Sequence, residues 1–98
     1  MILILFNTSI FDYAIKISTR EHNCLVRANK TTIWQLFLST DYEMLNNVRN
    51  FGVQSFNHIN TALKSLFGFE FADINNIKDY KNRLHLMNQL GFIDLKKR

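Results

Sequence analysis

Three side chains that bind polar partners share one expected helical face in the first third of the chain. Arg20, Asn23 and Cys24 are spaced i, i+3 and i+4, so on a helix all three project from the same side. Arginine and asparagine suit contacts with bases, sugars and phosphates, and a small cysteine lets a backbone approach closely. The spacing taken alone favours a plainer interpretation, in which Arg20 is solvated, Asn23 bonds locally and Cys24 is buried.

A second candidate site lies at a glycine-containing turn about 30 residues further on. In Asn50-Phe51-Gly52-Val53-Gln54-Ser55 the turn precedes an expected helix, whose first amides lack intrahelical acceptors and form a natural phosphate site. Ser55 can donate to a phosphate from the first turn, and His58 lies one turn further along the same side. A simple helix start with Ser55 as a polar first-turn residue explains the pattern equally well.

Catalysis finds little support in the sequence. The histidines at 22, 58 and 85 have no carboxylate or cysteine at metal-ligand spacing, and His22 and Cys24 would point about 160° apart on a helix. There is no glycine-rich phosphate loop, no Gly-x-Ser-x-Gly and no pair of carboxylates on one helical face. We therefore expect a non-catalytic domain with no metal, no cofactor and no small-molecule substrate.

The elements that must position these residues are expected to be short helices. Capping boxes begin at Ser18, Thr32 and Thr40, each with Glu or Gln three residues later. A fourth helix is predicted from about Val53 to Leu66, after the glycine turn. The apolar positions that recur with helical spacing are Leu25, Ile33, Leu36, Phe37, Met44, Leu45, Val48, Phe56, Ile59, Leu63 and Leu66.

The two ends of the sequence differ from this array. Residues 13–17 alternate in polarity and predict an extended segment, while residues 1–6 fit either a short strand or an extended arm on the helices. A last amphipathic helix of about 17 residues is predicted at 74–90, with Gly91 as its stop and packing as its plainest role. The sequence thus predicts a compact all-α bundle of short helices: an extended N-terminal arm at 1–17, a helical core at 18–69, and an extra C-terminal helix with a basic tail at 70–98.

Length, charge and composition limit the class of protein. Ninety-eight residues, 47% hydrophobic and 20% charged, make one domain and exclude a wholly disordered chain. No apolar run reaches the roughly 18 residues of a membrane span, and residues 1–6 lack the flanks of a signal peptide. One cysteine excludes an internal disulfide, and the net charge of +4 is compatible with nucleic acid. Frequent Phe, Ile, Asn and Lys, which have A/T-rich codons, indicate an A/T-rich genome, such as that of an organelle, an endosymbiont or a parasite. We expect no secretion and no membrane partner.

The order of these elements resembles a known family. An extended lead-in is followed by Ser-Thr-Arg-Glu-His-Asn-Cys-Leu at 18–25, Thr-Ile-Trp-Gln-Leu at 32–36, Thr-Asp-Tyr-Glu-Met-Leu at 40–45 and Asn-Phe-Gly-Val-Gln-Ser-Phe-Asn-His-Ile at 50–59. Over roughly residues 2–69 this is similar to the C-terminal domain of the RNA polymerase alpha subunit of bacteria and plastids. The specific part is the pair Arg20-x-x-Asn23-Cys24-Leu25 and Asn50-Phe51-Gly52-x-x-Ser55, which occur in register.

The resemblance implies an all-α fold with paired helix-hairpin-helix motifs and a non-catalytic role in transcription. It implies binding to upstream, double-stranded A/T-rich promoter DNA through the minor groove, and contacts with RNA polymerase subunits or transcription regulators, in bacterial cytoplasm or plastid (chloroplast) stroma. Arg20 would enter the groove, because narrow A/T-rich grooves attract arginine, and Gly52 and Ser55 would hold a phosphate. The predicted DNA-binding residues are Arg20, Asn23, Cys24, Gly52, Gln54, Ser55 and His58.

The sequence departs from the family's usual pattern in ways that affect these expectations. Val53 and Gln54 stand where the family usually has basic residues, and His58 stands where it often has an acidic one. Losing one or two phosphate-facing lysines should weaken binding and flatten its salt dependence by about one unit per contact. The sequence has no counterpart of the large N-terminal assembly domain of the alpha subunit; if the chain begins at Met1, we expect a free-standing fragment, a split gene product or a truncated form.

Two other functions fit the same residues. The domain could be a protein-interaction adaptor of the transcription machinery that has lost DNA binding and docks through residues 74–90 and 1–6; its dilute positive charge favours this alternative. It could also be a helix-hairpin-helix module of a repair or ribosomal protein. That alternative would also place backbone amides on phosphate, but it leaves the face formed by Arg20, Asn23 and Cys24 unexplained.

Overall fold

The computed structural model describes residues 6–12 and 16–95, most of which are helical. Its elements in sequence order are η1 (Ile10–Asp12), α2 (Thr19–Arg27), α3 (Ile33–Phe37), α4 (Asp41–Asn46), α5 (Val53–Phe67) and α6 (Ile77–Gln89). The described residues form no strand, and the β pairing among them consists of isolated bridges from Ser9 to Thr32 and from Thr40 to Ala72. The prediction of an all-α fold is therefore confirmed.

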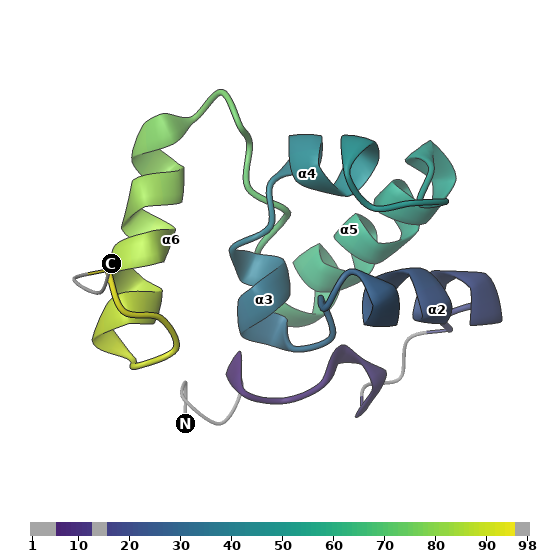
Figure 1. Ribbon diagram of the computed structural model, residues 1–98, viewed down its shortest axis with the longest axis horizontal. Coiled ribbons are helices and arrows are strands. Elements are labelled where there is room, and N and C mark those ends of the chain that lie inside the picture. The colour runs from purple at the N-terminus through teal and green to yellow at the C-terminus, as the bar shows by residue number, and fades with distance from the viewer. Residues whose placement is uncertain (1–5, 13–15, 96–98) are drawn as a thin grey trace.

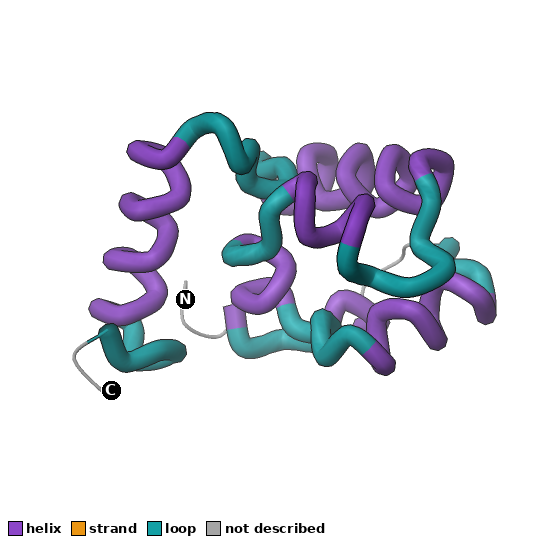
Figure 2. The backbone as a smooth tube through the Cα atoms, turned by 45° about the horizontal axis from the view of Figure 1, so that its top comes forward, coloured by secondary structure: helices purple, strands orange, loops and turns teal. Residues whose placement is uncertain are grey.

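The helices divide into a group and an outlying member. Helices α2, α3, α4 and α5 lie together, while α6 lies at one end of the molecule, with α3 between it and α2 (Figure 1). The view turned by 45° shows the same separation of α6 (Figure 2). The Cα radius of gyration is 13.1 Å and the extents are 36 × 29 × 25 Å, which is close to the size expected for this length.

The capping residues largely act as their sequence positions predict. The Ser18 hydroxyl accepts from the Glu21 amide at 3.1 Å and the Glu21 carboxylate accepts from the Ser18 amide at 3.1 Å, which completes a capping box. Gln35 accepts from the Thr32 amide at 3.0 Å, and the Thr40 hydroxyl accepts from the Glu43 amide at 3.0 Å. The box predicted at Thr40 lacks its return bond, because the Glu43 carboxylate pairs with Lys30 at 2.9 Å instead.

The predicted bounds of α5 hold and those of α6 need correction. Helix α5 spans Val53–Phe67, one residue longer than expected. Helix α6 has 13 residues and begins at Ile77, because the side-chain oxygen of Asn76 caps it and Ile74 lies in a turn before it. Gly91 does follow the helix end, with a φ of 87°, and the Phe92 amide donates to the Met87 carbonyl at 2.9 Å.

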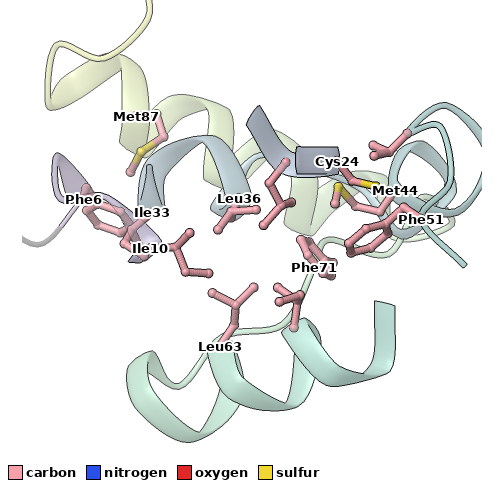
Figure 3. Packing of buried hydrophobic residues seen from close by; sticks show 13 residues of the cluster. Phe6, Ile10, Cys24, Ile33, Leu36, Met44, Phe51, Leu63, Phe71 and Met87 are labelled. Atoms are coloured by element: carbon pink, nitrogen blue, oxygen red, sulfur yellow. The ribbon is translucent and has the colours of Figure 1, made fainter. Parts of the chain in front are cut away.

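The core takes side chains from each of these elements (Figure 3). The apolar side chains with no exposed surface there are Ile10, Leu25, Ile33, Leu36, Met44, Ile59, Leu63, Ala72 and Met87. Two positions of the expected apolar pattern point outward instead: Leu45 is 39% exposed and Leu66 is 48% exposed. Leu45 directly follows the buried Met44, and neighbouring positions on a helix point about 100° apart, so Leu45 is turned away from the side that Met44 buries.

Arg83 attaches α6 to the rest of the domain. Its Nη1 donates to the carbonyls of Phe37 at 2.9 Å and Glu70 at 2.8 Å, and its Nε contacts Asp79 Oδ2 at 3.0 Å. The guanidinium carbon lies 4.7 Å from the centre of the Phe37 ring and 5.9 Å from that of Phe69. The C-terminal helix therefore packs on the domain, as its plainest interpretation predicted.

The N-terminal stretch crosses the helices at α3. The Ile10 amide donates a hydrogen bond to the Thr31 carbonyl at 2.7 Å, and the Ile33 amide donates to the Thr8 carbonyl at 3.0 Å. The short helix η1 lies within the N-terminal segment that was expected to be extended. The predicted arm at 1–6 and the alternating segment at 13–17 fall largely on residues 1–5 and 13–15, outside the described residues. No helix in the described ranges is long and apolar enough to cross a membrane.

Candidate nucleic-acid interface

The two sequence motifs meet at one backbone carbonyl. Arg20 Nη2 donates to the carbonyl oxygen of Asn50 at 3.1 Å, and Cys24 Sγ donates to the same oxygen at 3.5 Å. Arg20 and Asn23 are exposed, whereas Cys24 is buried. Helix α2 is therefore joined to the turn that lies 30 residues further along the sequence, and the burial of Cys24 agrees with the plainer interpretation of this spacing.

The turn is held in a conformation that orients this carbonyl. Asn50 has a φ of 63°, in the left-handed region that asparagine adopts more readily than most residues. Phe51, beside it, is buried in the core and its amide donates to the Val48 carbonyl at 3.3 Å. A buried aromatic ring and a left-handed residue together fix the turn between α4 and α5, so the Asn50 carbonyl faces α2.

A hollow of about 390 Å³ lies over this contact. The residues that line it are Thr19, Arg20, Asn23, Cys24, Arg27 and Asn50. Arg27 was absent from the residues predicted for the site, although it follows Arg20 by seven positions, or about two helical turns. Its exposed side chain adds a second positive charge beside Arg20, at the helix end where the helix dipole favours a cation.

The start of α5 presents free backbone donors next to this hollow. The first helical bond of α5 runs from the Phe56 amide to the Gly52 carbonyl at 2.9 Å, so the amides of Val53, Gln54 and Ser55 precede it. Gly52 has no side chain to cap them, and Gly52, Val53 and Gln54 are exposed. This geometry provides donors and the positive end of a helix dipole for an anion.

Glycine at position 52 is not required by the fold. Its φ is −90°, which any residue adopts, and a Cβ built there would meet no atom within 4 Å. Gly68 and Gly91 differ, because their φ values of 78° and 87° strain other residues. The missing side chain at 52 thus leaves the amides accessible without serving the packing of the domain.

Ser55 and His58, both predicted to contact DNA, contact Glu21 inside the protein. His58 Nδ1 lies 3.0 Å from Glu21 Oε1 and 3.1 Å from Oε2, and the Ser55 side chain also bonds to this carboxylate. Glu21 is 8% exposed. Burial alone would raise the pKa of Glu21, but the bonds from His58, the Ser18 amide and Ser55, with the charge of His58, together lower it.

The predicted residues therefore form two adjacent groups. Arg20, Asn23 and Cys24 line the hollow, and Gly52 and Gln54 lie at the exposed start of α5; Asn50 joins the first group to the second. The sequence predicted only a capping role for Glu21. Its contact with His58, 37 positions away, leaves no pattern in the residues around either side chain that could have predicted it. Among the described residues, no group of three or more His, Cys, Asp or Glu is arranged to hold a metal ion.

Comparison with known proteins places this arrangement in a family. Two of the most similar relatives are the DNA-directed RNA polymerase subunits alpha of Thermotoga petrophila and Thermotoga maritima, each 39% identical over 56 residues. The subunit of the same name from a Synechococcus strain is 39% identical over 54 residues. These matches cover 57% or 55% of this chain but only 16% of each relative. No solved structure matches the sequence.

The family described as the C-terminal domain of the alpha chain of bacterial RNA polymerase matches residues 7–65, more than half of the sequence. The match is narrower than the resemblance expected over residues 2–69, and α6 lies beyond it. It contains both motifs and the Asn50 carbonyl that joins them. The protein therefore belongs to the family of C-terminal domains of bacterial RNA polymerase alpha subunits.

Proposed function

We propose that this protein is a non-catalytic transcription module that binds double-stranded, A/T-rich promoter DNA through the minor groove. The observation that carries the proposal is the convergence of Arg20 and Cys24 on the Asn50 carbonyl. That contact places the exposed face of α2 beside the exposed start of α5. One element then supplies a cation for the groove and the other supplies amides for a phosphate.

Arg20 suits this role because it is both exposed and oriented. Arg20 Nη2 donates to the Asn50 carbonyl. A guanidinium has five N–H donors in a planar arrangement, so the remaining N–H groups of Arg20 can donate to DNA. Narrow A/T-rich minor grooves concentrate negative potential, which attracts an inserted arginine. The minor groove offers a degenerate pattern of donors and acceptors, so preference should follow groove width more than exact sequence.

The start of α5 suits a phosphate of the same groove. Its first amides have no intrahelical acceptor, and position 52 carries no side chain that would hold a phosphate away. Phosphate contacts of this kind fix the register of a protein on the duplex, and base-edge contacts then act from a fixed position. With Val53 and Gln54 uncharged, Arg20 and Arg27 supply the positive charge of the hollow.

The wider biological role is proposed from the relatives. The matched relatives are subunits of DNA-directed RNA polymerase, and the match spans only 16% of their length. We propose that the protein serves transcription beside the polymerase, with RNA polymerase subunits or transcription regulators as partners. A bacterial cytoplasm or a plastid stroma suits that role. The plastid is proposed because the amino-acid composition favours residues with A/T-rich codons, which indicates an A/T-rich genome.

Fluorescence anisotropy with two labelled duplexes tests the DNA proposal. One duplex contains an A-tract and the other is G/C-rich, and each is titrated at two salt concentrations with the protein, Arg20→Ala and Lys81→Ala. Lys81 is exposed on α6, at the end of the molecule away from α2, so its variant removes the same charge elsewhere. We expect salt-dependent binding that favours the A-tract, is lost in Arg20→Ala and is retained in Lys81→Ala.

Two results would contradict this proposal. Equal binding by Arg20→Ala and the parent would remove the groove role of Arg20. The absence of binding by a folded parent protein, with folding checked by circular dichroism, would refute DNA binding by this domain.

A second candidate function is supported by an apolar surface between α4 and the start of α6. Tyr42 is 52% exposed, Ile74 is 41% exposed and Ile77 is 55% exposed, and all three line a hollow of about 370 Å³. Clustered exposed apolar residues are typical of protein interfaces. This surface favours the adaptor alternative, in which the domain docks on another component of the transcription machinery.

Surface substitutions test the adaptor better than removal of residues 70–98 does. Phe71, Ala72 and Met87 are buried in the core, so that deletion would damage the fold itself. We expect Ile77→Ser to weaken co-sedimentation with purified bacterial RNA polymerase whose own alpha C-terminal domains are removed, and to leave DNA affinity unchanged. The adaptor alternative fails if the parent protein does not co-sediment with that polymerase.

A further inference from the structure

The carboxylate of Glu21 lies where α2 meets α5. A buried carboxylate is costly unless its oxygens are hydrogen-bonded, and Glu21, at 8% exposed, has partners on both helices. The Ser18 amide donates to it from the start of α2, while His58 and Ser55 bond to it from the first turns of α5. One side chain thus connects the two elements that carry the proposed DNA surface.

The position of this negative charge raises an electrostatic problem for phosphate binding. An uncompensated carboxylate beside the start of α5 would repel the anion that the free amides attract. His58 can compensate it, because a protonated imidazole at 3.0 Å makes the pair neutral overall. A neutral His58 still donates from Nδ1 but leaves one negative charge on the pair.

Helix α5, which carries His58, and helices α2 and α4 carry other charged groups. Besides Glu21, the charged or titratable side chains of α2, α4 and α5 are Arg20, His22, Arg27, Asp41, Tyr42, Glu43 and Lys64, with the thiol of Cys24. Lys64 pairs with Glu70 at 3.1 Å and Glu43 pairs with Lys30 at 2.9 Å. Of these helices, α5 carries the histidine that contacts Glu21 directly, His58.

We infer that Glu21 is a positioning residue for the DNA surface, and that it acts through His58, whose protonation state is thereby linked to DNA binding. The inference rests on the proposed function, because it concerns the same surface. The carboxylate holds Ser55 and His58 so that the start of α5 keeps a fixed relation to Arg20 on α2. Phosphate favours the protonated pair, so binding takes up a proton and affinity rises as the pH falls.

The expected size of the pH effect follows from Coulomb's law. A unit charge gained about 7 Å from a phosphate in water changes the binding constant by about threefold. We therefore expect the affinity for an A-tract duplex to rise by about threefold between pH 8 and pH 5.5 in the parent protein. His58→Gln should bind with a flat profile, while His22→Gln and His85→Gln, which alter exposed histidines on α2 and α6, should keep the rise.

Variants of Glu21 separate positioning from simple electrostatics. If Glu21 acts on DNA only through its charge, removing that negative charge should tighten binding. If Glu21 positions α5 relative to α2 through its hydrogen bonds, removing it should weaken binding. We expect Glu21→Ala to weaken binding and Glu21→Gln, which keeps an acceptor oxygen, to restore part of the affinity. If Glu21→Ala does not fold, the comparison of Glu21→Gln with the parent protein makes the same test.

The possible outcomes distinguish this inference from the proposed function. A parent protein that is folded but binds no duplex at any pH refutes the proposed function, and the coupling to DNA falls with it. Three results would overturn the inference and leave the proposed function intact. They are a flat pH profile in a parent protein that binds DNA, an increase in affinity at low pH that persists in His58→Gln, and Glu21 variants that bind as tightly as the parent. A thermal-stability cycle with Glu21→Gln, His58→Gln and the double variant tests the link without DNA, and additive melting shifts would mean that no link exists.

Discussion

Arg83 provides the clearest test of how α6 is held to the domain. The Arg83→Met variant keeps an unbranched stem against the rings of Phe37 and Phe69 but removes the guanidinium. It thereby leaves the Phe37 and Glu70 carbonyls, which lie 2.9 and 2.8 Å from Nη1, without this donor. The side chain of Arg83 is only 13% exposed, so water replaces the guanidinium poorly.

The expected cost follows from these contacts. A hydrogen bond from a charged group contributes about 1.5–3 kcal/mol, and the bond to the half-buried Phe37 residue should account for most of the loss. Asp79 is 43% exposed, so its ion pair adds at most about 1 kcal/mol. We therefore expect Arg83→Met to lower the free energy of unfolding by about 3 kcal/mol and Tm by about 12–24 °C.

Urea unfolding followed by circular dichroism measures this loss, with Lys81→Met as the control. Lys81 lies on the same helix and is exposed, so its variant removes the same charge without removing a buried contact. A loss below about 1 kcal/mol in Arg83→Met would mean that apolar packing alone holds α6. An equal loss in Lys81→Met would show that the helix itself, and not the Arg83 contacts, was affected.

Arg27→Gln should reduce the slope of the logarithm of the DNA-binding constant against the logarithm of salt concentration by about 0.9, because one phosphate contact is lost. It should weaken binding to the A-tract and G/C-rich duplexes equally. An unchanged slope would exclude a phosphate contact by Arg27. Gly91→Ala, at a φ of 87°, should lower the stability by about 1 kcal/mol, whereas Gly52→Ala should leave Tm unchanged and weaken DNA binding; the reverse pattern would contradict the assignment of their roles. Because folding lowers the pKa of Glu21, its contribution to stability is present above its unfolded value of about 4.3 and is lost as the pH falls through its folded value. Glu21→Gln should therefore lose less stability than the parent between pH 6 and pH 3, and equal losses would refute the role of this group.

The helices could be predicted because their signals are local. Ser18 and Glu21 are three residues apart and form the expected box, and the helical period of Ile59 and Leu63 indicates which side of α5 is buried. The start of α6 was predicted too early because Ile74 fits the apolar period, whereas the cap at Asn76 sets the boundary. Periodicity shows that a helix is present, but the competition between a turn and a cap decides where it begins.

Only part of the candidate site could be predicted, because some of its contacts join residues that are far apart in the sequence. Resemblance to a family supplied Arg20 and Gly52, but the residues that orient them act over long sequence distances. Glu21 meets His58 across 37 positions, and Arg20 meets the Asn50 carbonyl across 30 positions. Such pairs form only when the fold brings the helices together, so no spacing rule in the sequence could have indicated them.

The aromatic contact between Phe6 and Phe92 has a consequence for how the domain could be connected to other proteins. Their ring centroids lie 6.3 Å apart, and Trp34 of α3 stacks on Phe92 at 5.5 Å, so both ends of the described residues meet beside α3 and α6. Helix α2 lies toward the opposite end of the molecule (Figure 1). Any segment that continues from Phe6 or from Phe92 therefore departs near one pole of the described domain, and α2, with the proposed DNA-binding face around Arg20, lies toward the other.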